Sequence, residues 1–254
     1  MTKTINLNTD RKDINSSICK LNVLFGNAPI KTWEKGWDST IVSQIENIWD
    51  EIEELTEAYE NNDRGEIMDA YGDIITFAYG VSFFLGGAPL YNIGLEPSLE
   101  FNKENADTDI ILEELKRTYT LLLKSFKHFA ESGKPSDYTQ EAYNDFQFEL
   151  YDLIMTANQL SVVYNFDPYE VMDRVNTSNL TKFCTDQEDA DETMAYYRDL
   201  GIDVYSREIF IDSDTSVFVV YSSSAQTDVN GKVYRAHKFL KNQRTFTAPD
   251  FSDL

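Results

Sequence analysis

Residues 44–85, QIENIWDEIEELTEAYENNDRGEIMDAYGDIITFAYGVSFFL, contain the pattern that decides the fold. We expect two helices, over residues 41–61 and 64–85, joined by a short polar turn at Asn62 and Asp63. In the first helix, apolar residues recur at spacings of three and four, which places them on one side of a helix with 3.6 residues per turn. They are Ile41, Ile45, Ile48, Ile52, Leu55 and Tyr59. The stretch therefore predicts a pair of helices that pack through apolar stripes.

Carboxylates border these stripes on both helices. Glu51 and Glu54 flank the first stripe, while Glu66, Asp69 and Asp73 share one face of the second helix. Neighbouring carboxylates repel one another, and partly buried ones are costly unless a cation balances them. No Lys or Arg lies between residues 44 and 61, so the pattern favours a hard divalent cation such as Mg²⁺. The alternative is a solvated acidic face that the helix dipole stabilises near helix N-termini.

The two acidic segments resemble a known family. DEIEE at 50–54 and EIMDAYGDII at 66–75 are similar to the paired EExxE and ExxD-type helices of the MazG-like, all-α NTP pyrophosphohydrolases. That superfamily also includes phosphoribosyl-ATP pyrophosphohydrolases and dimeric dUTPases. The family's second-helix Glu, three residues before the Asp that matches Asp73, is Ala70 here, so Asp69 or Glu66 must take its place.

Three further segments are similar to phage MazG-like proteins. VNTSNLTKF at 175–183 resembles the V-x-x-SN-x-(S/T)-K segment that follows the helices in those proteins. GKVYR at 231–235, continued by Lys238, Lys241 and Pro249-Asp250, resembles their basic tail, and LFGNAP at 24–29 resembles their opening segment. Together these matches extend over most of the chain.

The helical pattern occurs a second time, over residues 111–126 and 138–164. Glu113-Glu114-Leu115 aligns with Glu53-Glu54-Leu55, and Leu150-Tyr151-Asp152 aligns with Tyr71-Gly72-Asp73, which suggests an internal duplication. The copies differ in their acids, because Ile111 matches Glu51 and Arg117 matches Glu57. The second copy keeps Asp145, Glu149 and Asp152 on one helix face. We therefore expect one competent site, in the first copy, with the second copy as its packing partner.

The expected fold class is mainly α, a MazG-like tandem-repeat bundle of four-helix type with a small C-terminal α+β appendage. We assign residues 1–40 to an N-terminal arm, 41–184 to the bundle and 185–254 to the appendage. In the appendage we expect a helix at 188–200, strands at 204–211 and 217–222, and a further β segment after the turn at 228–231. The chain would be a monomer that acts as a pseudo-dimer, or a homodimer.

Composition restricts the function. The net charge of −22 argues against a nucleic-acid-binding surface and against an anionic membrane as partner. No apolar run approaches the length of a membrane span and no signal peptide is evident, so we expect a cytoplasmic protein, in the host cytoplasm if it is viral. Cys19 and Cys184 form no disulfide framework or zinc motif, and we expect them to be reduced packing residues.

The resemblance implies a reaction in which a (d)NTP and water give a (d)NMP and pyrophosphate, serving the nucleotide pool of a phage or its host. Mg²⁺, or Mn²⁺ in its place, would be held by Glu51, Glu54, Asp69 and Asp73, and either Asp50 or Glu66 would orient or deprotonate the attacking water. Phosphate oxygens would be bound by Asn179, Lys182, Lys232, Arg235, Lys238 and Lys241.

Several readings stay open at this point. The chain could be an acidic binding protein with a decayed site, acting as a nucleic-acid mimic or sequestering a basic partner, and Ala70 favours that alternative. The basic residues of the tail could be a solvated strand face. Trp33 and Trp37 could stack on a base, although they fit the edge of the core better, and His128 and His237 are expected to be structural.

Overall fold

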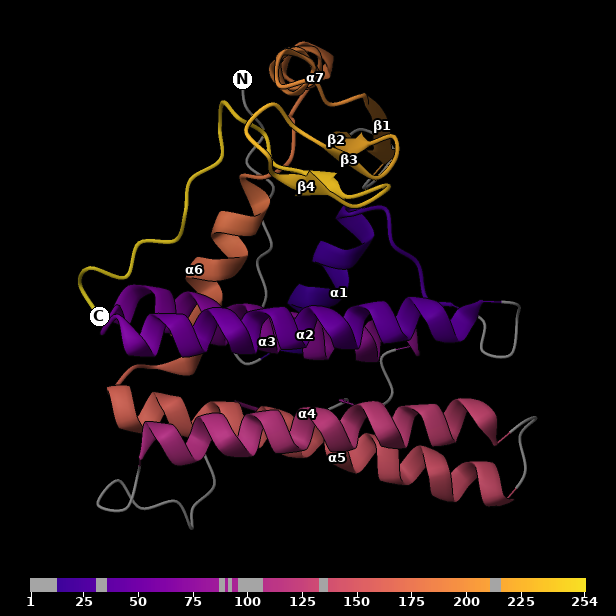
Figure 1. Cartoon of the computed structure of the whole chain (residues 1–254), viewed down its shortest axis with the longest axis vertical. Helices are drawn as coiled ribbons and strands as arrows, with labels where there is room; N and C mark the ends of the chain where they lie inside the picture. Colours follow the sequence, from indigo (N-terminus) through magenta and orange to yellow (C-terminus); the bar gives the residue numbers. More distant parts are fainter. Residues whose placement is uncertain are drawn as a thin grey trace. The chain divides into compact units, whose positions relative to one another are not determined.

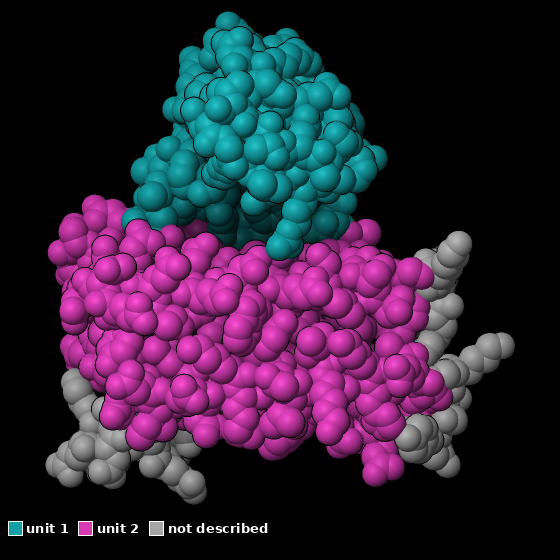
Figure 2. All heavy atoms as spheres, viewed as in Figure 1, with its two compact units in different colours: residues 1–8, 20–27, 176–249 teal, residues 9–19, 28–175, 250–254 magenta. Residues whose placement is uncertain are grey.

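The computed structural model describes residues 13–30, 36–86, 90, 93–95, 107–132, 137–210 and 216–254 (Figure 1). The chain divides into two compact units, coloured separately in Figure 2. Among the described residues, the larger, helical unit contains 13–19, 28–175 and 250–254, and the smaller unit contains 20–27 and 176–249. No described helix is long and apolar enough to cross a membrane.

Four long helices form the body of the helical unit. They are α2 (Trp37–Glu60), α3 (Arg64–Phe84), α4 (Thr108–Glu131) and α5 (Asp137–Tyr164). Helix α2 packs against α3 and α4 against α5, while α2 also contacts α4 and α3 contacts α5 (Figure 1). The chain is thus mainly helical, as expected. Asp63 fixes the start of α3, because its side chain accepts the backbone N–H groups of Gly65 and Glu66 at 3.1 and 3.2 Å.

Helix α2 begins earlier than expected because Trp37 belongs to the core. Its ring is buried and makes edge contacts with Phe126 and Phe129, with ring centroids 5.7 and 5.8 Å apart. Trp37 therefore covers the core and does not offer a face for base stacking. Trp33 lies outside the described residues.

The two helix pairs bury residues at matching positions. In the alignment of the two copies, Ile52 and Leu55 of α2 match Leu112 and Leu115 of α4, and all four side chains are buried. The same holds between α3 and α5 for four matched pairs: Ile67 with Phe146, Tyr71 with Leu150, Ile74 with Leu153 and Ile75 with Ile154. Both pairs therefore use the same faces to form one continuous core.

The outer faces of α3 and α5 differ. Gly72 of α3 lies so close to α6 (Pro168–Leu180) that a β-carbon there would be 2.5 Å from Cγ2 of Val175. The matching residue on α5, Tyr151, is 39% exposed. Helix α6 therefore covers α3 at a point where the matching face of α5 is open. Ile14 and Ile18, in the first half of α1 (Ile14–Leu24), complete the same core.

The smaller unit combines one helix with two small sheets. Helix α7 (Gln187–Asp199) precedes β1 (Val204–Phe210) and β2 (Ser216–Ser222), which pair in antiparallel fashion, and β5 (Phe239–Leu240) pairs with β2. Strands β3 (Gln226–Thr227) and β4 (Val233–Tyr234) form a second, two-stranded sheet. Leu21 and Leu24 pack with Val217 and Val219 of β2, so the start of the chain contributes to this core.

The units differ from the expected division at both ends. The smaller unit begins at Asn176 and includes 20–27, whereas we expected an appendage over 185–254 alone. The last five residues belong to the helical unit, where Phe251 is buried in the core. Arg174 of α6 forms an ion pair with Asp253, and Arg64 donates to the carbonyl of Leu254. Ends far apart in the sequence thus complete each unit.

Candidate functional site

The candidate site lies along the contact between α2 and α3. Glu51 and Glu54 stand on α2 beside Ile48, Ile52 and Leu55, which are fully buried. Helix α3 contributes Asp69 and Asp73, which are half-buried like Glu51, and Glu66, which is exposed like Glu54 and Asp50. The predicted carboxylates therefore sit at the border between core and solvent.

The electrostatics show that these carboxylates are close neighbours. Burial, together with the negative charges of Asp73, Glu54, Asp69 and Asp50, raises the pKa of Glu51 to about 9. The pKa of Glu54 is raised first by partial burial and then by Asp73, Glu66, Asp50 and Glu57. Since Asp73 acts on both glutamates, Glu51, Glu54 and Asp73 form the centre of the cluster.

The α2–α3 pair contains one basic residue, and its side chain binds backbone carbonyls of other segments. Between residues 37 and 84 the sequence contains a single Arg or Lys, Arg64, and no His. Arg64 stands at the start of α3, where it donates to the carbonyl of Tyr164 at 2.8 Å and to that of Leu254. The α2–α3 pair therefore brings carboxylates together without a basic residue of its own to balance them.

In the second helix pair, a basic residue lies beside the carboxylates. Arg117 of α4 donates to Glu114 at 2.7 Å and lies 3.9 Å from Asp152 of α5. The pKa of Glu149 is raised by burial and by Asp152, but Arg117 lowers it. Thr118 also donates to Asp152, at 3.4 Å. Arg117 occupies the position of Glu57, so the second pair has a cation beside its carboxylates where the first pair has another acid.

The residue types in the first cluster suit a hard cation, since Mg²⁺ prefers carboxylate oxygens. Their placement is looser, because within the described part of the chain no three His, Cys, Asp or Glu side chains converge closely enough to hold a metal ion. The residue at position 70 is a buried alanine, whose side chain has no atom that could bind a metal. The donor chemistry therefore fits a divalent cation, and the side chains would have to draw together around it.

The six predicted phosphate-binding residues all lie in the smaller unit. The structure brings two of them together: the ammonium group of Lys182 donates to the side-chain oxygen of Asn179. Lys232 lies over the ring of Tyr234 at 5.7 Å, and Lys241 over that of Phe246 at 4.1 Å. Arg235 and Lys238 are exposed, as are Lys232 and Lys241. These four cations are thus accessible to an anion.

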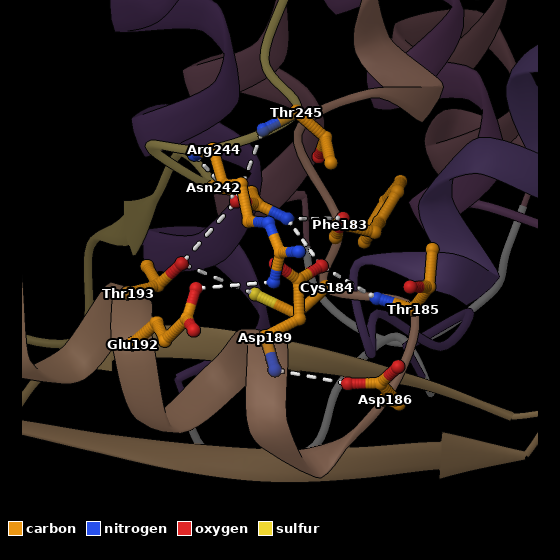
Figure 3. Close-up of polar contacts among 10 residues, drawn as sticks. All are labelled: Phe183, Cys184, Thr185, Asp186, Asp189, Glu192, Thr193, Asn242, Arg244 and Thr245. Carbon is orange, nitrogen blue, oxygen red and sulfur yellow. Dashed lines mark hydrogen bonds and ion pairs between the residues drawn. The ribbon is translucent and has the colours of Figure 1, made fainter.

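A buried polar network near the start of α7 was not predicted (Figure 3). Asn242 is fully buried, donates to the carbonyl of Phe183 at 3.1 Å and to Asp189 at 2.7 Å, and accepts from Thr193 at 3.3 Å. Beside it, burial raises the pKa of Cys184 to about 11, so its thiol stays protonated and unreactive. The network fixes the chain after β5 to α7, and no sequence pattern marks it because its members are far apart.

Comparisons with known proteins give one distant relative. The chain is 26% identical over 223 residues to "Uncharacterized protein L479" of Acanthamoeba polyphaga mimivirus, which covers 85% of this chain and 83% of the mimivirus protein. No family model matches the chain. No solved structure matches it either.

Proposed function

We propose that this chain is a Mg²⁺-dependent nucleoside triphosphate pyrophosphohydrolase with its metal site on the α2–α3 pair. The reaction would convert a (d)NTP and water into a (d)NMP and pyrophosphate. The resemblance of the two acidic segments to MazG-like enzymes suggests the chemistry. The observation that carries the proposal is the charge difference between the helix pairs: the carboxylates around Glu51 share no basic residue on their helices, whereas Arg117 serves those around Asp152.

Each part of the proposed site has a named residue. Glu51, Glu54, Asp69 and Asp73 would hold the metal, and Glu66 stands next to them on α3 in place of the acid missing at Ala70. A bound Mg²⁺ would neutralise triphosphate charge and lower the pKa of a bound water. Asp50 or Glu66, both exposed, would orient that water or accept its proton.

We also infer that the four-helix body arose by duplication. The matched buried positions of α2 with α4 and of α3 with α5 support this. Under this proposal the second pair completes within one chain the packing that a second subunit provides in dimeric relatives.

The decisive experiment is a pyrophosphate-release assay. The full chain is incubated with each of the eight canonical NTPs and dNTPs, with Mg²⁺, with Mn²⁺ and with EDTA. We expect metal-dependent release from at least one nucleotide. Asp73→Asn should lower kcat/KM on the order of 10²- to 10³-fold, because it removes several kcal/mol of charge stabilisation at the metal. The matched variant Asp152→Asn should stay close to wild type.

Equal losses in both variants would contradict the assignment of the site to α2–α3. Absence of release under every condition would contradict the enzymatic proposal itself.

An acidic binding protein is the second candidate, and buried Ala70 is the observation that favours it. In that case the carboxylates would recognise a basic partner. The same assay separates the two candidates, since a binding protein releases no pyrophosphate with any nucleotide or metal.

A further inference from the structure

A tight turn in the smaller unit is fixed to the sheet by hydrogen bonds with Ser222. Residues 235–238 form this turn, which the N–H of Lys238 closes by donating to the carbonyl of Arg235 at 3.2 Å. The hydroxyl of Ser222, buried at the end of β2, donates to the same carbonyl at 2.6 Å and accepts the N–H of Lys238 at 3.0 Å. The N–H of His237 donates to the Ser222 carbonyl at 3.0 Å. The turn is therefore rigidly positioned.

His237 occupies the strained position of this turn. Its φ is 57°, in the left-handed region where a β-carbon is unfavourable. The other described non-glycine residues with positive φ are Asn62 and Asn165. Asparagine and histidine both adopt this conformation more often than most non-glycine residues do. A glycine would suit the backbone of the turn better than histidine does. The imidazole is instead present and faces β1, with Nδ1 3.3 Å from the hydroxyl of Tyr205.

Tyr205 is an exposed aromatic ring that is already held in place. It stacks on Tyr221 with ring centroids 5.4 Å apart and an interplanar angle of 25°. Tyr221 is itself anchored, because its hydroxyl donates to the carbonyl of Phe25 at 2.7 Å. In the sheet, Tyr205, Tyr221 and Phe239 lie directly across from one another on three adjacent strands. The row runs from the core to the edge, where Tyr205 is 39% exposed.

Exposed cations lie on the same turn as His237, the residue that contacts this ring. Residues 229–249 contain no acidic residue and five basic ones, Lys232, Arg235, Lys238, Lys241 and Arg244, in a chain of net charge −22. Arg235 and Lys238 flank His237 on the rigid turn, and all three are exposed. An aromatic ring in contact with a turn that carries cations is suited to a ligand that has both an aromatic base and phosphate groups.

We propose that Tyr205 and the turn 235–238 form a nucleotide-binding surface, with the base stacked on Tyr205 and the phosphates bound by Arg235 and Lys238. His237 is a positioning residue that holds the tyrosine ring through its hydroxyl. Because the ring is fixed before the ligand arrives, little side-chain freedom is lost on binding. The assignment rests on the proposed function for the class of ligand and goes beyond it by naming the residue that receives the base.

The test is equilibrium binding of ATP and of inorganic tripolyphosphate to the full chain by calorimetry in EDTA, where binding is measured without metal-dependent turnover. We expect Tyr205→Leu to weaken ATP binding roughly 5- to 100-fold, the effect of one lost base stack, and to leave tripolyphosphate binding unchanged. Lys238→Gln should weaken both ligands, each about tenfold. His237→Gly should weaken ATP binding while the Tm stays equal or rises.

Two variants on α7 serve as matched controls. Tyr196→Leu removes another exposed tyrosine of the same unit, and Arg198→Gln another exposed cation. Neither should change ATP binding. The surface assignment is wrong if the wild-type chain binds no ATP, or if Tyr196→Leu and Tyr205→Leu weaken binding equally.

Two further outcomes are informative. Tighter binding of a ten-residue oligothymidylate than of dTTP would overturn the assignment to free nucleotides in favour of single-stranded nucleic acid. ATP binding that depends on Tyr205 in a chain that releases no pyrophosphate would support this surface and reject the proposed hydrolysis, so the two failures are distinguishable.

Discussion

The α2–α3 and α4–α5 pairs use the same buried positions, yet they balance their carboxylates in opposite ways. Around Glu51, burial and four neighbouring carboxylates raise the pKa to about 9. Around Asp152, Arg117 is close enough to form an ion pair. The comparison shows that, in these helix pairs, the residues that determine packing are not the residues that determine the charge. The apolar stripe specifies how the helices pack, and one position on the adjoining face, Glu57 or Arg117, decides whether an acid or a base stands beside the carboxylates.

The pairs also differ in what covers them, and Gly72→Ala tests this difference with the largest expected effect on stability. The new β-carbon would overlap Val175, a short and buried side chain that cannot swing away. We expect a loss of about 2–3 kcal/mol in the free energy of unfolding, which exceeds the roughly 1 kcal/mol that alanine gains over glycine in a helix.

Thermal unfolding measures this loss, as a Tm lowered by roughly 4–10 °C. Tyr151→Ala, at the matched exposed position of α5, is the control and should cost much less. A double variant with Val175→Ala should show favourable coupling between the two sites. A higher Tm for Gly72→Ala would mean that α6 does not press on α3 as described.

The pH dependence of the stability of Glu51→Gln tests the charge difference between the two helix pairs. The folded pKa of about 9 lies above the unfolded value near 4.3, so between these values the folded chain retains a proton that the unfolded chain has lost. Glu51 therefore makes the protein progressively less stable as pH rises through this window. The variant should match wild type near pH 5 and be more stable at pH 8, by about 1–2 kcal/mol.

Mg²⁺ should raise the Tm of the wild-type chain more at pH 8 than at pH 5, and should have little effect on Glu51→Gln. Differential scanning calorimetry at the two pH values, with and without Mg²⁺, measures both responses. If Mg²⁺ stabilised the variant as much as wild type, its binding site would lie elsewhere.

Glu57→Arg should give the first pair a cation beside its carboxylates, as in the second pair. Of the three substitutions it should have the smallest effect on stability. It places an Arg three residues after Glu54, as Arg117 stands three residues after Glu114. The new cation should lower the pKa of Glu54 and stabilise the metal-free chain by roughly 0.3–1 kcal/mol, the usual range for an exposed helical pair. It should also reduce the thermal response to Mg²⁺. An unchanged response would show that Glu57 stands too far from the cluster to affect it.

Local patterns predicted the elements well. The apolar periodicity identified both helix pairs, and alternation identified β1 and β2 to within a residue or two. Segment 232–240 was less predictable, because the turn at 235–238 divides it into two short strands on different sheets. The turn is held by a hydrogen bond from Ser222 of β2 to the carbonyl of Arg235. No local sequence pattern reveals a contact with a residue of another strand.

The candidate site was only partly predictable for the same reason. Helical spacing placed Glu66, Asp69 and Asp73 on one face, and the shared influence of Asp73 on Glu51 and Glu54 agrees with that placement. The pairing of Lys182 with Asn179 is local and follows from their position at the end of α6. By contrast, the contact of Tyr205 with His237 joins residues from separate strands and turns, so it could be recognised only in three dimensions.

The interleaved composition of the two units has a consequence for synthesis. Leu21 and Leu24 are made long before their partners Val217 and Val219, which follow α5 and α7 in the chain. Phe251 and Asp253, which complete the helical unit, are made later still. A ribosome that has finished α5 therefore carries a nearly complete bundle in which Leu21 and Leu24 do not yet have these partners. No single cut between residues 28 and 249 separates the units, and neither can be produced whole as one contiguous fragment.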